Sequence, residues 1–597
     1  MKTIRVCCGT GCLANGSRNV AEAFEQEIGK NMLPANVECI VKRTGCNGFC
    51  ENGPLVTIVP DNISYYHVKP EDVPEILEKT ILGAETVDRL LYKNDKGERV
   101  RSQEENPFYA PQQKIALRNI GRISPASVED YVASGGYEGL KKALAMSPEE
   151  IFEIMDASGL RGRGGAGFPT GTKWRTAAQY DVYPKYVACN GDEGDPGAFM
   201  DRSILEGDPH SVLEGLAICA VAIKAEEGFL YIRDEYGLAV ENVTRAIKSA
   251  EEAGFLGDHI LGTDKKLHLQ VVRGGGAFVC GESTALMASI EGRVGEPRAK
   301  YIRSVQKGLW DHPTVLNNVE TLANVPYIIV HGGEAFASVG TEGSKGTKVF
   351  ALVGKVKRTG LVEVPMGATL RHLIFDIGGG IIGNRPFKAV QTGGPSGGCI
   401  PESMLDLPVD FDKLKEYGAM MGSGGMIVMD DRSCMVEVAR YYVQFLCGES
   451  CGKCTPCREG LKQMLHILTD ICEGRGRLED LDLLEALAET MIDSSLCALG
   501  KSAPNPVLTT IRYFREEYEA QIREHRCPAG VCKKLTTFVI DPGRCRGCTA
   551  CASGCPAGAI SGTVKQPHQI DQTKCIVCGS CREACRFGAV MTEGRAK

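Results

Sequence analysis

The sequence lacks three features that would place it in a common class. It has no excess of positive charge, because its net charge is −7, and this argues against nucleic acid or an anionic membrane surface as a partner. It has no apolar run near the ~18 residues that a membrane-spanning helix needs. Its first residues predict a short strand rather than an export signal. We therefore expect a cytoplasmic protein.

Length and composition indicate several globular domains. The chain has 597 residues, of which 43% are hydrophobic and 24% charged, as in an average folded protein. Length alone suggests about four domains. Cysteine departs from the average, with 27 residues in tight clusters. In a chain without an export signal, such clusters indicate metal or iron–sulfur ligands rather than disulfides.

The most informative stretch is rich in glycine and basic residues. Residues 158–175 read Ser-Gly-Leu-Arg-Gly-Arg-Gly-Gly-Ala-Gly-Phe-Pro-Thr-Gly-Thr-Lys-Trp-Arg. Glycine lets the backbone adopt positive φ and approach a ligand closely, and exposed N–H groups beside cations bind phosphate. A flexible surface loop is the alternative, but Phe168 and Trp174 argue against it, since a free linker gains nothing from large aromatics. The stretch therefore predicts a nucleotide or flavin site.

An acidic loop follows an apolar strand a little further on. Residues 186–190 are followed by Gly-Asp-Glu-Gly-Asp-Pro-Gly, at a strand's carboxyl end, where α/β sheets bind ligands. Three close carboxylates, Asp192, Glu193 and Asp195, are usually a solvated turn or a Ca²⁺ loop. Beside a phosphate-binding loop they can instead accept hydrogen bonds from ribityl and ribose hydroxyls, which is the role we expect.

Four cysteines of the first 90 residues lie in Gly-rich turns. Cys7 and Cys12 precede a helical stretch, and Cys46 and Cys50 follow it. Turn N–H groups can donate hydrogen bonds to cluster sulfurs, so this pattern suits an iron–sulfur centre. A redox dithiol or a zinc site is the alternative, but the region has neither a C-x-x-C pair nor suitably spaced histidines.

A second cysteine group opens a helical region. Cys451, Cys454 and Cys457 form a C-x2-C-x2-C run, and Cys497 supplies a remote fourth thiol. Three close cysteines and a distant one are typical of a [4Fe–4S] cluster, although zinc could use the same thiols.

Residues 537–597 contain an internal repeat. Two runs of the form C-x2-C-x2-C-x3-C follow each other. Each is a bacterial ferredoxin run, in which the fourth cysteine ligates the other cluster. We therefore predict one [4Fe–4S] cluster on Cys545, Cys548, Cys551 and Cys585 and a second on Cys575, Cys578, Cys581 and Cys555.

A further cysteine pair precedes this repeat. Cys527 and Cys532 are too sparse for a cluster by themselves. A zinc site completed by His525 and a distant cysteine such as Cys472 is plausible by ligand type. Buried free thiols are an equally good interpretation.

The run from Gly159 to Trp174 resembles the flavin loop of the NADH-oxidising flavoprotein subunit of respiratory complex I. That family includes the β subunits of multimeric hydrogenases and formate dehydrogenases. Residues 272–284 and 313–321 resemble further parts of the same flavin pocket. The resemblance implies FMN and NAD(P)(H), with these residues at the site: Gly162, Arg163, Gly164, Gly165, Phe168, Lys173, Asn190, Asp192, Glu193, Asp195, Phe278, Gly281, Glu282, Ser283, Lys300, Arg303, Asn317, Asn318 and Thr321.

The resemblance also implies a multidomain α/β architecture. The C-x4-C…C-x3-C pattern is similar to the family's thioredoxin-like [2Fe–2S] domain, whose spacing selects Cys7 over Cys8. The expected parts are a thioredoxin-like domain at 1–90, a linker at 91–113, an α/β FMN and NAD(P)-binding domain at 114–340, a ubiquitin-like β-grasp module at 341–430, a helical [4Fe–4S] domain at 431–526 and a ferredoxin-like domain at 527–597. We assign no chemistry to the β-grasp module.

Two departures from the family concern the nucleotide. The family commonly has a glutamate where this chain has Ser283, and an aromatic residue near Arg303. A carboxylate at the adenosine ribose accepts from the 2′-hydroxyl and repels a 2′-phosphate. Its loss and a nearby cation favour NADP(H) over NAD(H), although Arg303 could be a plain surface residue.

The ferredoxin tail resembles the β subunit of electron-bifurcating [FeFe]-hydrogenases and related transhydrogenases. Hydride would pass from NAD(P)H, stacked at Phe168, to FMN, and single electrons would leave through the Cys451 cluster. The implied partners are a catalytic hydrogenase or other oxidoreductase subunit, a small [2Fe–2S] subunit and ferredoxin. The chain has no cysteine group for a hydrogen-activating cluster. A non-bifurcating diaphorase subunit and a passive electron-transfer scaffold are the alternatives.

Overall fold

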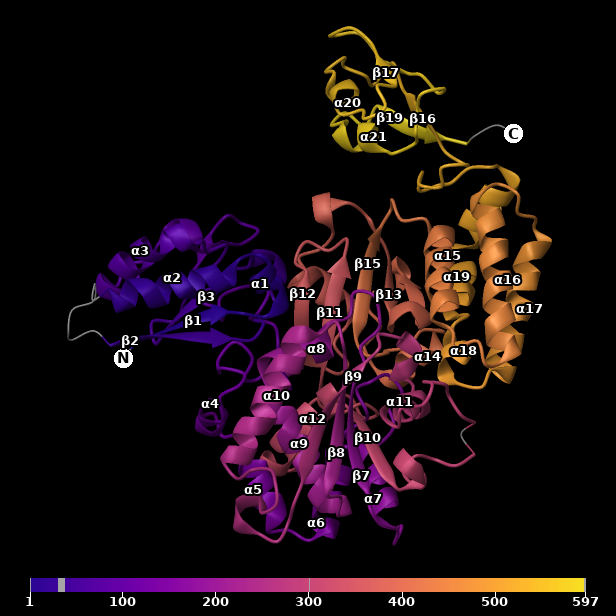
Figure 1. Ribbon diagram of the computed structural model, residues 1–597. Helices are drawn as coiled ribbons and strands as arrows, with labels where there is room; N and C mark the ends of the chain where they lie inside the picture. Colours follow the sequence, from indigo (N-terminus) through magenta and orange to yellow (C-terminus); the bar gives the residue numbers. More distant parts are fainter. Residues whose placement is uncertain (1, 31–37, 300, 595–597) are drawn as a thin grey trace. The chain divides into compact units, whose positions relative to one another are not determined.

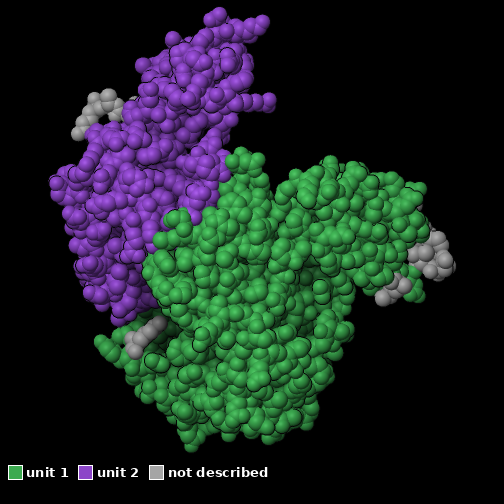
Figure 2. Space-filling view, turned by 180° about the vertical axis from the view of Figure 1, so that it is seen from behind, with its two compact units in different colours: residues 1–384, 391–394, 403–428 green, residues 385–390, 395–402, 429–597 purple. Residues whose placement is uncertain are grey.

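The computed structural model describes residues 2–30, 38–299 and 301–594. They form two compact units (Figure 2). The first comprises residues 1–384, 391–394 and 403–428, and the second comprises 385–390, 395–402 and 429–597. Among the described residues, no helix is long and apolar enough to cross a bilayer.

The first unit begins with a four-stranded sheet in the order β2-β1-β3-β4 (Figure 1). Alternation in β1 buries Ile4 and Val6, which pack with Phe24 in one core. β1 runs parallel to β2 and antiparallel to β3, as in a thioredoxin-like domain. The elements are β1 (Lys2–Cys7), α1 (Thr10–Ala14), α2 (Ser17–Gly29), β2 (Cys39–Thr44), β3 (Val56–Val59), β4 (Ile63–Tyr65) and α3 (Val73–Ile76).

The expected linker at 91–113 is packed rather than free. It starts with the hairpin of β5 (Tyr92–Lys93) and β6 (Arg99–Val100). Phe108 is fully buried, and its ring stacks on that of Phe49 with centroids 4.3 Å apart. Aromatic burial of this size fixes the segment against the turn between Cys46 and Cys50.

The predicted flavin domain has a parallel sheet in the order β10-β7-β8-β9. Strand β7 is an almost continuously buried run, as expected for a parallel sheet covered on both faces. α9 packs against α12 and α5. The elements are α4 (Val128–Ala133), α5 (Glu138–Leu144), α6 (Pro148–Ser158), α7 (Thr170–Ala178), β7 (Tyr186–Gly191), α8 (Met200–Gly207), α9 (Pro209–Ile223), β8 (Glu227–Arg233), α10 (Gly237–Glu252), β9 (His268–Gly274), α11 (Ser283–Ile290), β10 (Thr314–Asn318), α12 (Val319–His331) and α13 (Gly333–Ala337).

A β-rich module follows. β11 (Thr347–Gly354) pairs antiparallel with β12 (Gly360–Pro365) and parallel with β15 (Gly425–Asp430). A hairpin beside a parallel strand is the pattern expected of a β-grasp sheet. α14 (Phe411–Glu416) precedes β15, and the chain passes between the two units through β13 (Phe387–Thr392) and β14 (Gly398–Pro401).

The second unit contains five helices and a small ferredoxin-like tail. The helices are α15 (Met435–Glu449), α16 (Thr455–Cys472), α17 (Glu479–Ser494), α18 (Ala498–Ser502) and α19 (Asn505–Arg523). The tail pairs its first and last strands antiparallel, which brings the two halves of the repeat together. Its elements are β16 (Thr537–Ile540), α20 (Ala550–Ser553), β17 (Ile560–Ser561), β18 (Gln569–Ile570), α21 (Ser580–Ala584) and β19 (Val590–Glu593).

Candidate flavin site and iron–sulfur centres

The glycine-rich stretch forms the loop between α6 and α7. Gly159 ends α6 in the left-handed region with φ 59°, and Gly165 and Gly167 have φ 115° and 62°. Gly165 also forms a β-bridge with Gly422, and an added Cβ would lie 3.3 Å from the Gly422 backbone. Positive φ and this close approach both require glycine. The loop is therefore compact, and it has backbone conformations that glycine adopts without strain.

The arginines of this loop bind protein carbonyls. Arg163 is fully buried, and burial lowers the pKa of its guanidinium to about 10. The guanidinium donates to the carbonyls of Arg161, Thr347 and Lys345, at 2.8, 3.1 and 2.6 Å. The Arg163 side chain therefore does not take the phosphate-facing place that the sequence predicts, and its main-chain N–H donates to Thr321 Oγ1.

Lys173 is the cation of this stretch that lies at the sheet. Its Nζ donates to the Leu316 carbonyl at 2.9 Å and lies 3.4 Å from Asn317 Oδ1, at the end of β10. Burial lowers its pKa to about 8. A half-buried ammonium with few partners is well suited to pair with a phosphate.

The acidic loop after β7 is held by side-chain contacts. Asn190 donates to the Gly281 carbonyl at 2.9 Å, and Asp192 accepts from Arg233 at 3.1 Å. Glu193 is buried and accepts from the first N–H groups of α8, both at 3.1 Å. Asn190 and Asp192 thus lie at the predicted edge of the sheet, whereas the Glu193 carboxylate caps a helix.

Asp195 connects this loop to the β-rich module. Its Oδ2 accepts from the Ser423 hydroxyl at 3.0 Å. Burial raises the pKa of Asp195 to about 7, with smaller contributions from Glu193 and Asp192, while Ser423 and Arg233 oppose the rise. Gly394 leaves no room for a Cβ beside this carboxyl group. The module to which we assigned no chemistry therefore contacts a predicted site residue.

Residues 278–303 contribute a further part of the predicted site. Phe278 and Gly281 lie in a short turn, and Glu282 caps α11 by accepting from the Thr284 N–H at 2.8 Å. Ser283 donates its hydroxyl to Glu282 at 3.0 Å. The ring of Phe168 is 38% exposed, and the Arg303 guanidinium lies 5.8 Å from its centroid. Lys300 lies outside the described residues.

The start of α12 completes the predicted set. Asn318 caps the helix through the Thr321 N–H, and Thr321 Oγ1 accepts from the Arg163 N–H at 2.8 Å. Asn317 Nδ2 is buried and has no hydrogen-bond partner among the described residues. Thr170 Oγ1 and Trp174 Nε1, both on α7, are also buried without a hydrogen-bond partner among the described residues. Buried polar atoms are nearly always paired, so these atoms fit a bound polar group such as FMN.

The four predicted thiols of the first domain lie together. Cys46 and Cys50 have their sulfurs 3.6 Å apart, and Cys46 Sγ accepts from the Gly48 N–H at 3.3 Å. The Cys7 thiol is hydrogen-bonded with Cys12 and Cys46. The contact with Cys12 and burial raise the pKa of Cys7, whereas the contact with Cys46 opposes the rise. Such a shared thiol set, with a main-chain donor to one sulfur, suits a [2Fe–2S] cluster.

The helical domain gathers its predicted thiols at the start of α16. Burial raises the pKa of Cys457 to about 11, and Cys454, Cys497 and Cys451 add to the rise through their charges. The Ser450 hydroxyl lies 3.2 Å from Cys457 Sγ. The remote cysteine is thus brought to the other three, as a [4Fe–4S] site requires.

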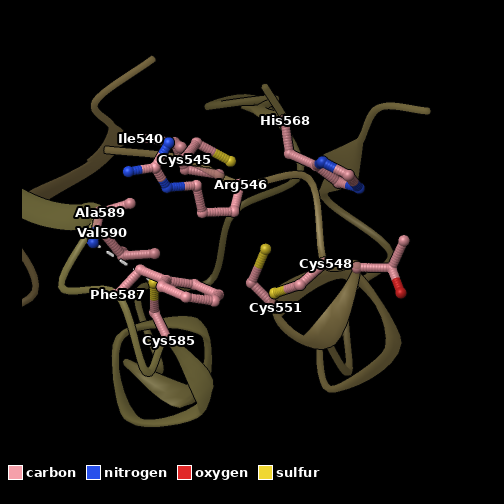
Figure 3. A pocket seen from close by; sticks show the side chains of 11 residues that line it. Ile540, Cys545, Arg546, Cys548, Cys551, His568, Cys585, Phe587, Ala589 and Val590 are labelled. Atoms are coloured by element: carbon pink, nitrogen blue, oxygen red, sulfur yellow. Dashed lines mark hydrogen bonds between the residues drawn. The ribbon is translucent and has the colours of Figure 1, made fainter. Parts of the chain in front are cut away.

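The tail contains two cysteine-lined cavities. The first, shown in Figure 3, is lined by Cys545, Cys548, Cys551 and Cys585. The second is lined by Cys575, Cys578, Cys581 and Cys555. These are the two sets that the crossed ferredoxin pattern predicts, and each cavity fits a [4Fe–4S] cluster by its donor set.

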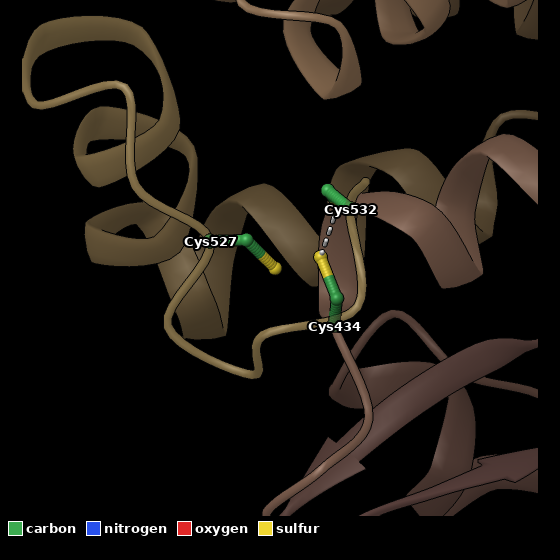
Figure 4. A group of neighbouring side chains, drawn as sticks. All are labelled: Cys434, Cys527 and Cys532. Atoms are coloured by element: carbon green, nitrogen blue, oxygen red, sulfur yellow. Dashed lines mark hydrogen bonds between the residues drawn. The ribbon is translucent and has the colours of Figure 1, made fainter. Parts of the chain in front are cut away.

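A separate thiol group contains a cysteine that the spacing did not indicate. Cys434, immediately before α15, has its sulfur 3.6 Å from that of Cys532, and both lie within 4.8 Å of Cys527 Sγ (Figure 4). Cys472 lies within the same distance of Cys532. His525, which we expected as a ligand, is in neither group. Only tertiary packing reveals Cys434, because it lies 98 residues before Cys532.

Comparisons with known proteins agree with this domain order. Residues 1–81 match the family described as thioredoxin-like [2Fe-2S] ferredoxin, 155–327 the Nuo51 FMN-binding domain, 437–521 the NADH-ubiquinone oxidoreductase-F iron-sulfur binding region and 537–586 the 4Fe-4S dicluster domain. These matches confirm the predicted fold class.

Two curated relatives and one solved structure cover most of the chain. NADP-reducing hydrogenase subunit HndC of Solidesulfovibrio fructosivorans is 52% identical over 76% of this chain and 93% of its own length. The F 2 subunit of NADH-quinone oxidoreductase of Rhizobium meliloti is 45% identical over 69% and 99%. A crystal structure of NAD+-reducing [NiFe]-hydrogenase has 29% identity and a TM-score of 0.62, and covers 87% of this chain and 84% of its own. The chain therefore belongs to the family of flavin- and iron–sulfur-containing, NADH-binding subunits of NADH-quinone oxidoreductases and hydrogenases.

Proposed function

We propose that this chain exchanges hydride between NAD(P)(H) and FMN and passes single electrons through one [2Fe–2S] and three [4Fe–4S] clusters. The observation that carries the proposal is the convergence of the glycine loop, Lys173 and the Asn317 amide nitrogen at the carboxyl edge of a parallel sheet. That nitrogen is buried and has no partner among the described residues. That edge is where α/β sheets bind nucleotides. When bound, FMN accepts two electrons as hydride and releases them one at a time.

The residues of the chain bind and orient the reactants. The N–H groups of the glycine loop and the Lys173 ammonium would hold the FMN phosphate. Asn190 and Asp192 would bind ribityl or ribose hydroxyls, and the exposed Phe168 ring would stack on the nicotinamide. No side chain is required as a covalent nucleophile.

Purified protein provides the test of this proposal. It should contain FMN and reduce an artificial one-electron acceptor with NADH or NADPH. Lys173→Met should lose FMN, whereas Lys266→Met, an exposed lysine paired with Glu226, should retain it. Protein with intact clusters but no FMN and no nucleotide oxidation would favour the passive scaffold instead.

Electron bifurcation is the finer part of the proposal, and it rests on the ferredoxin tail. Ferredoxin and a catalytic hydrogenase or transhydrogenase subunit would be the two electron partners, with a small [2Fe–2S] subunit as a further partner. Turnover of the purified complex should depend strictly on both electron partners. Turnover with either partner alone would identify a non-bifurcating diaphorase subunit.

Nucleotide preference should favour NADP(H). The absence of a carboxylate at Ser283 and the cation at Arg303 support this preference, as does the relative named as NADP-reducing. Ser283→Glu should raise kcat/KM for NADH relative to NADPH. If the ratio of the two kcat/KM values did not change, Ser283 would not explain the nucleotide preference.

The thiol group in the second unit is proposed as a zinc site. Cys434, Cys527 and Cys532 form one group of neighbouring ligand atoms, and Cys472 and Glu437 form a second group with Cys532. Four thiolates from Cys434, Cys472, Cys527 and Cys532 would be the ligand set that structural zinc prefers. Zinc content should fall in Cys434→Ser and stay unchanged in His525→Ala. Zinc well below one per chain in the unmodified protein would leave these residues as buried thiols.

A further inference from the structure

The two cavities of the tail correspond position by position. Cys545 and Cys575 are 30 residues apart in the sequence, and every other lining residue of one cavity has its counterpart 30 residues away in the other. The main-chain donors are matched as well. Ala559 N–H donates to Cys555 Sγ and Ala589 N–H to Cys585 Sγ, each at 3.3 Å. Any difference between the cavities therefore comes from side chains.

Three residues of the first lining have a polar side chain where the matching residue of the second lining has none. Arg546 in the first lining corresponds to Ile576 in the second, and Thr549 corresponds to Gly579. The histidine of the first lining, His568, stands where the second has a phenylalanine. His568 is 2% exposed, and its Nε2 has no partner among the described residues. Figure 3 shows its side chain among those that line the cavity.

Polar groups near the second cavity lie outside its lining. The Ser580 hydroxyl is 3.4 Å from Cys578 Sγ, and the charge of Lys533 also acts on Cys578. The Arg582 guanidinium lies over the Phe538 ring and donates to the Ala529 carbonyl at 2.9 Å. Arg546 is the cation that lines a cluster cavity in the described part of the tail.

We propose that Arg546 makes the two [4Fe–4S] clusters unequal, so that the first electron to enter the tail resides on the Cys545 set. A reduced cluster gains negative charge, which a neighbouring cation stabilises, and charge and hydrogen bonding are what set cluster potentials. The tail then acts in two steps: the Cys545 cluster holds the first electron, and the Cys575 cluster holds a second, more strongly reducing one. This inference rests on the two-cluster part of the proposed function and not on its nucleotide chemistry.

The test is an EPR redox titration of the full-length protein. Two reduced clusters in one small domain couple magnetically, whereas a singly reduced pair gives an uncoupled signal. The unmodified protein should show an uncoupled signal before the coupled one. In Arg546→Ile, which gives the first cavity the residue of the second, the ratio of reduced to oxidised Cys545 cluster at fixed potential should fall about fivefold, the size expected for an exposed charge. Raising the ionic strength should reduce the difference between the reduction potentials of the two clusters in the unmodified protein only, because salt screens exposed charges.

The reciprocal variant is the matched control. Ile576 is 55% exposed, so Ile576→Arg should fold and should raise the reduced fraction of the Cys575 cluster by a similar factor. The proposal would be overturned if the two clusters of the unmodified protein were reduced in a single step. It would also be overturned if Arg546→Ile did not change the difference between their reduction potentials. Neither result would contradict the presence of two clusters. Lack of a coupled signal at full reduction would instead overturn the two-cluster assignment, and the proposal with it.

Discussion

The protonation of Asp195 should control nucleotide oxidation above neutral pH. Burial is the largest cause that raises the pKa of this carboxyl group to about 7, so it is mostly neutral at pH 6 and mostly ionised at pH 8. The proposed site also receives the phosphates of FMN and NAD(P)H. An ionised Asp195 adds negative charge beside them, and the neutral form therefore favours nucleotide binding.

The magnitude follows from a single ionisation. One pH unit above the pKa, about one-tenth of the carboxyl groups remain protonated, so kcat/KM should fall about tenfold between pH 6 and pH 8. Ser423→Ala removes a hydrogen bond that favours the ionised form, which is worth ~1.5–3 kcal/mol. The pKa should therefore rise, and the decline in kcat/KM should move to higher pH by about one to two units.

The assay is steady-state oxidation of NADPH by an artificial acceptor from pH 5.5 to 9.5. Asp195→Asn should give a flat kcat/KM in the window where the unmodified protein declines. Asp264→Asn is the matched control, since the Asp264 side chain is 87% exposed and belongs to a distant surface turn. Retention of the decline in Asp195→Asn would refute the assignment to this residue, and a shift to lower pH in Ser423→Ala would refute the hydrogen-bond argument.

Three further variants test the structure around the site. Gly165→Ala should lose FMN, measured by flavin fluorescence after denaturation, because alanine resists φ 115° and would meet the Gly422 backbone; Gly237→Ala, with nothing within 4 Å, should retain it. Lys348→Met should lower the free energy of unfolding by ~3–5 kcal/mol, because it leaves the buried Glu320 carboxylate unpaired, and the double variant with Glu320→Gln should recover much of that loss in urea titrations. Phe49→Ala should cost ~3–5 kcal/mol of packing and expose residues 101–113 to limited proteolysis; resistance equal to that of the unmodified protein would contradict it.

The sequence predicted best what depends on local spacing. The fold class and the family are confirmed, because short motifs such as the ferredoxin runs carry their ligand pattern in a few residues. The structure also brings each predicted cluster set together, including the remote Cys497. The ligand assignments themselves stay predictions.

Contacts between distant segments could not be predicted in this way. Cys434 has no motif around it and joins Cys532 only through packing. Glu193 was expected to face the ligand as part of an acidic loop, but α8 begins beside it and its N–H groups take the carboxylate. The aromatic contacts of residues 91–113 were hidden by the charged, proline-containing composition around them, which resembles that of a free linker.

The contacts of Arg163 make two segments of this protein depend on each other. Its guanidinium joins the flavin loop to carbonyls of residues 345 and 347, beyond the boundary that a motif-based division would place at residue 340. A fragment that ends at residue 340 would contain the buried Arg163 guanidinium without the carbonyls of residues 345 and 347 that it binds. A chimeric protein that contains the flavin loop therefore also needs the β-rich module that follows it. The two segments should be exchanged between relatives as one unit.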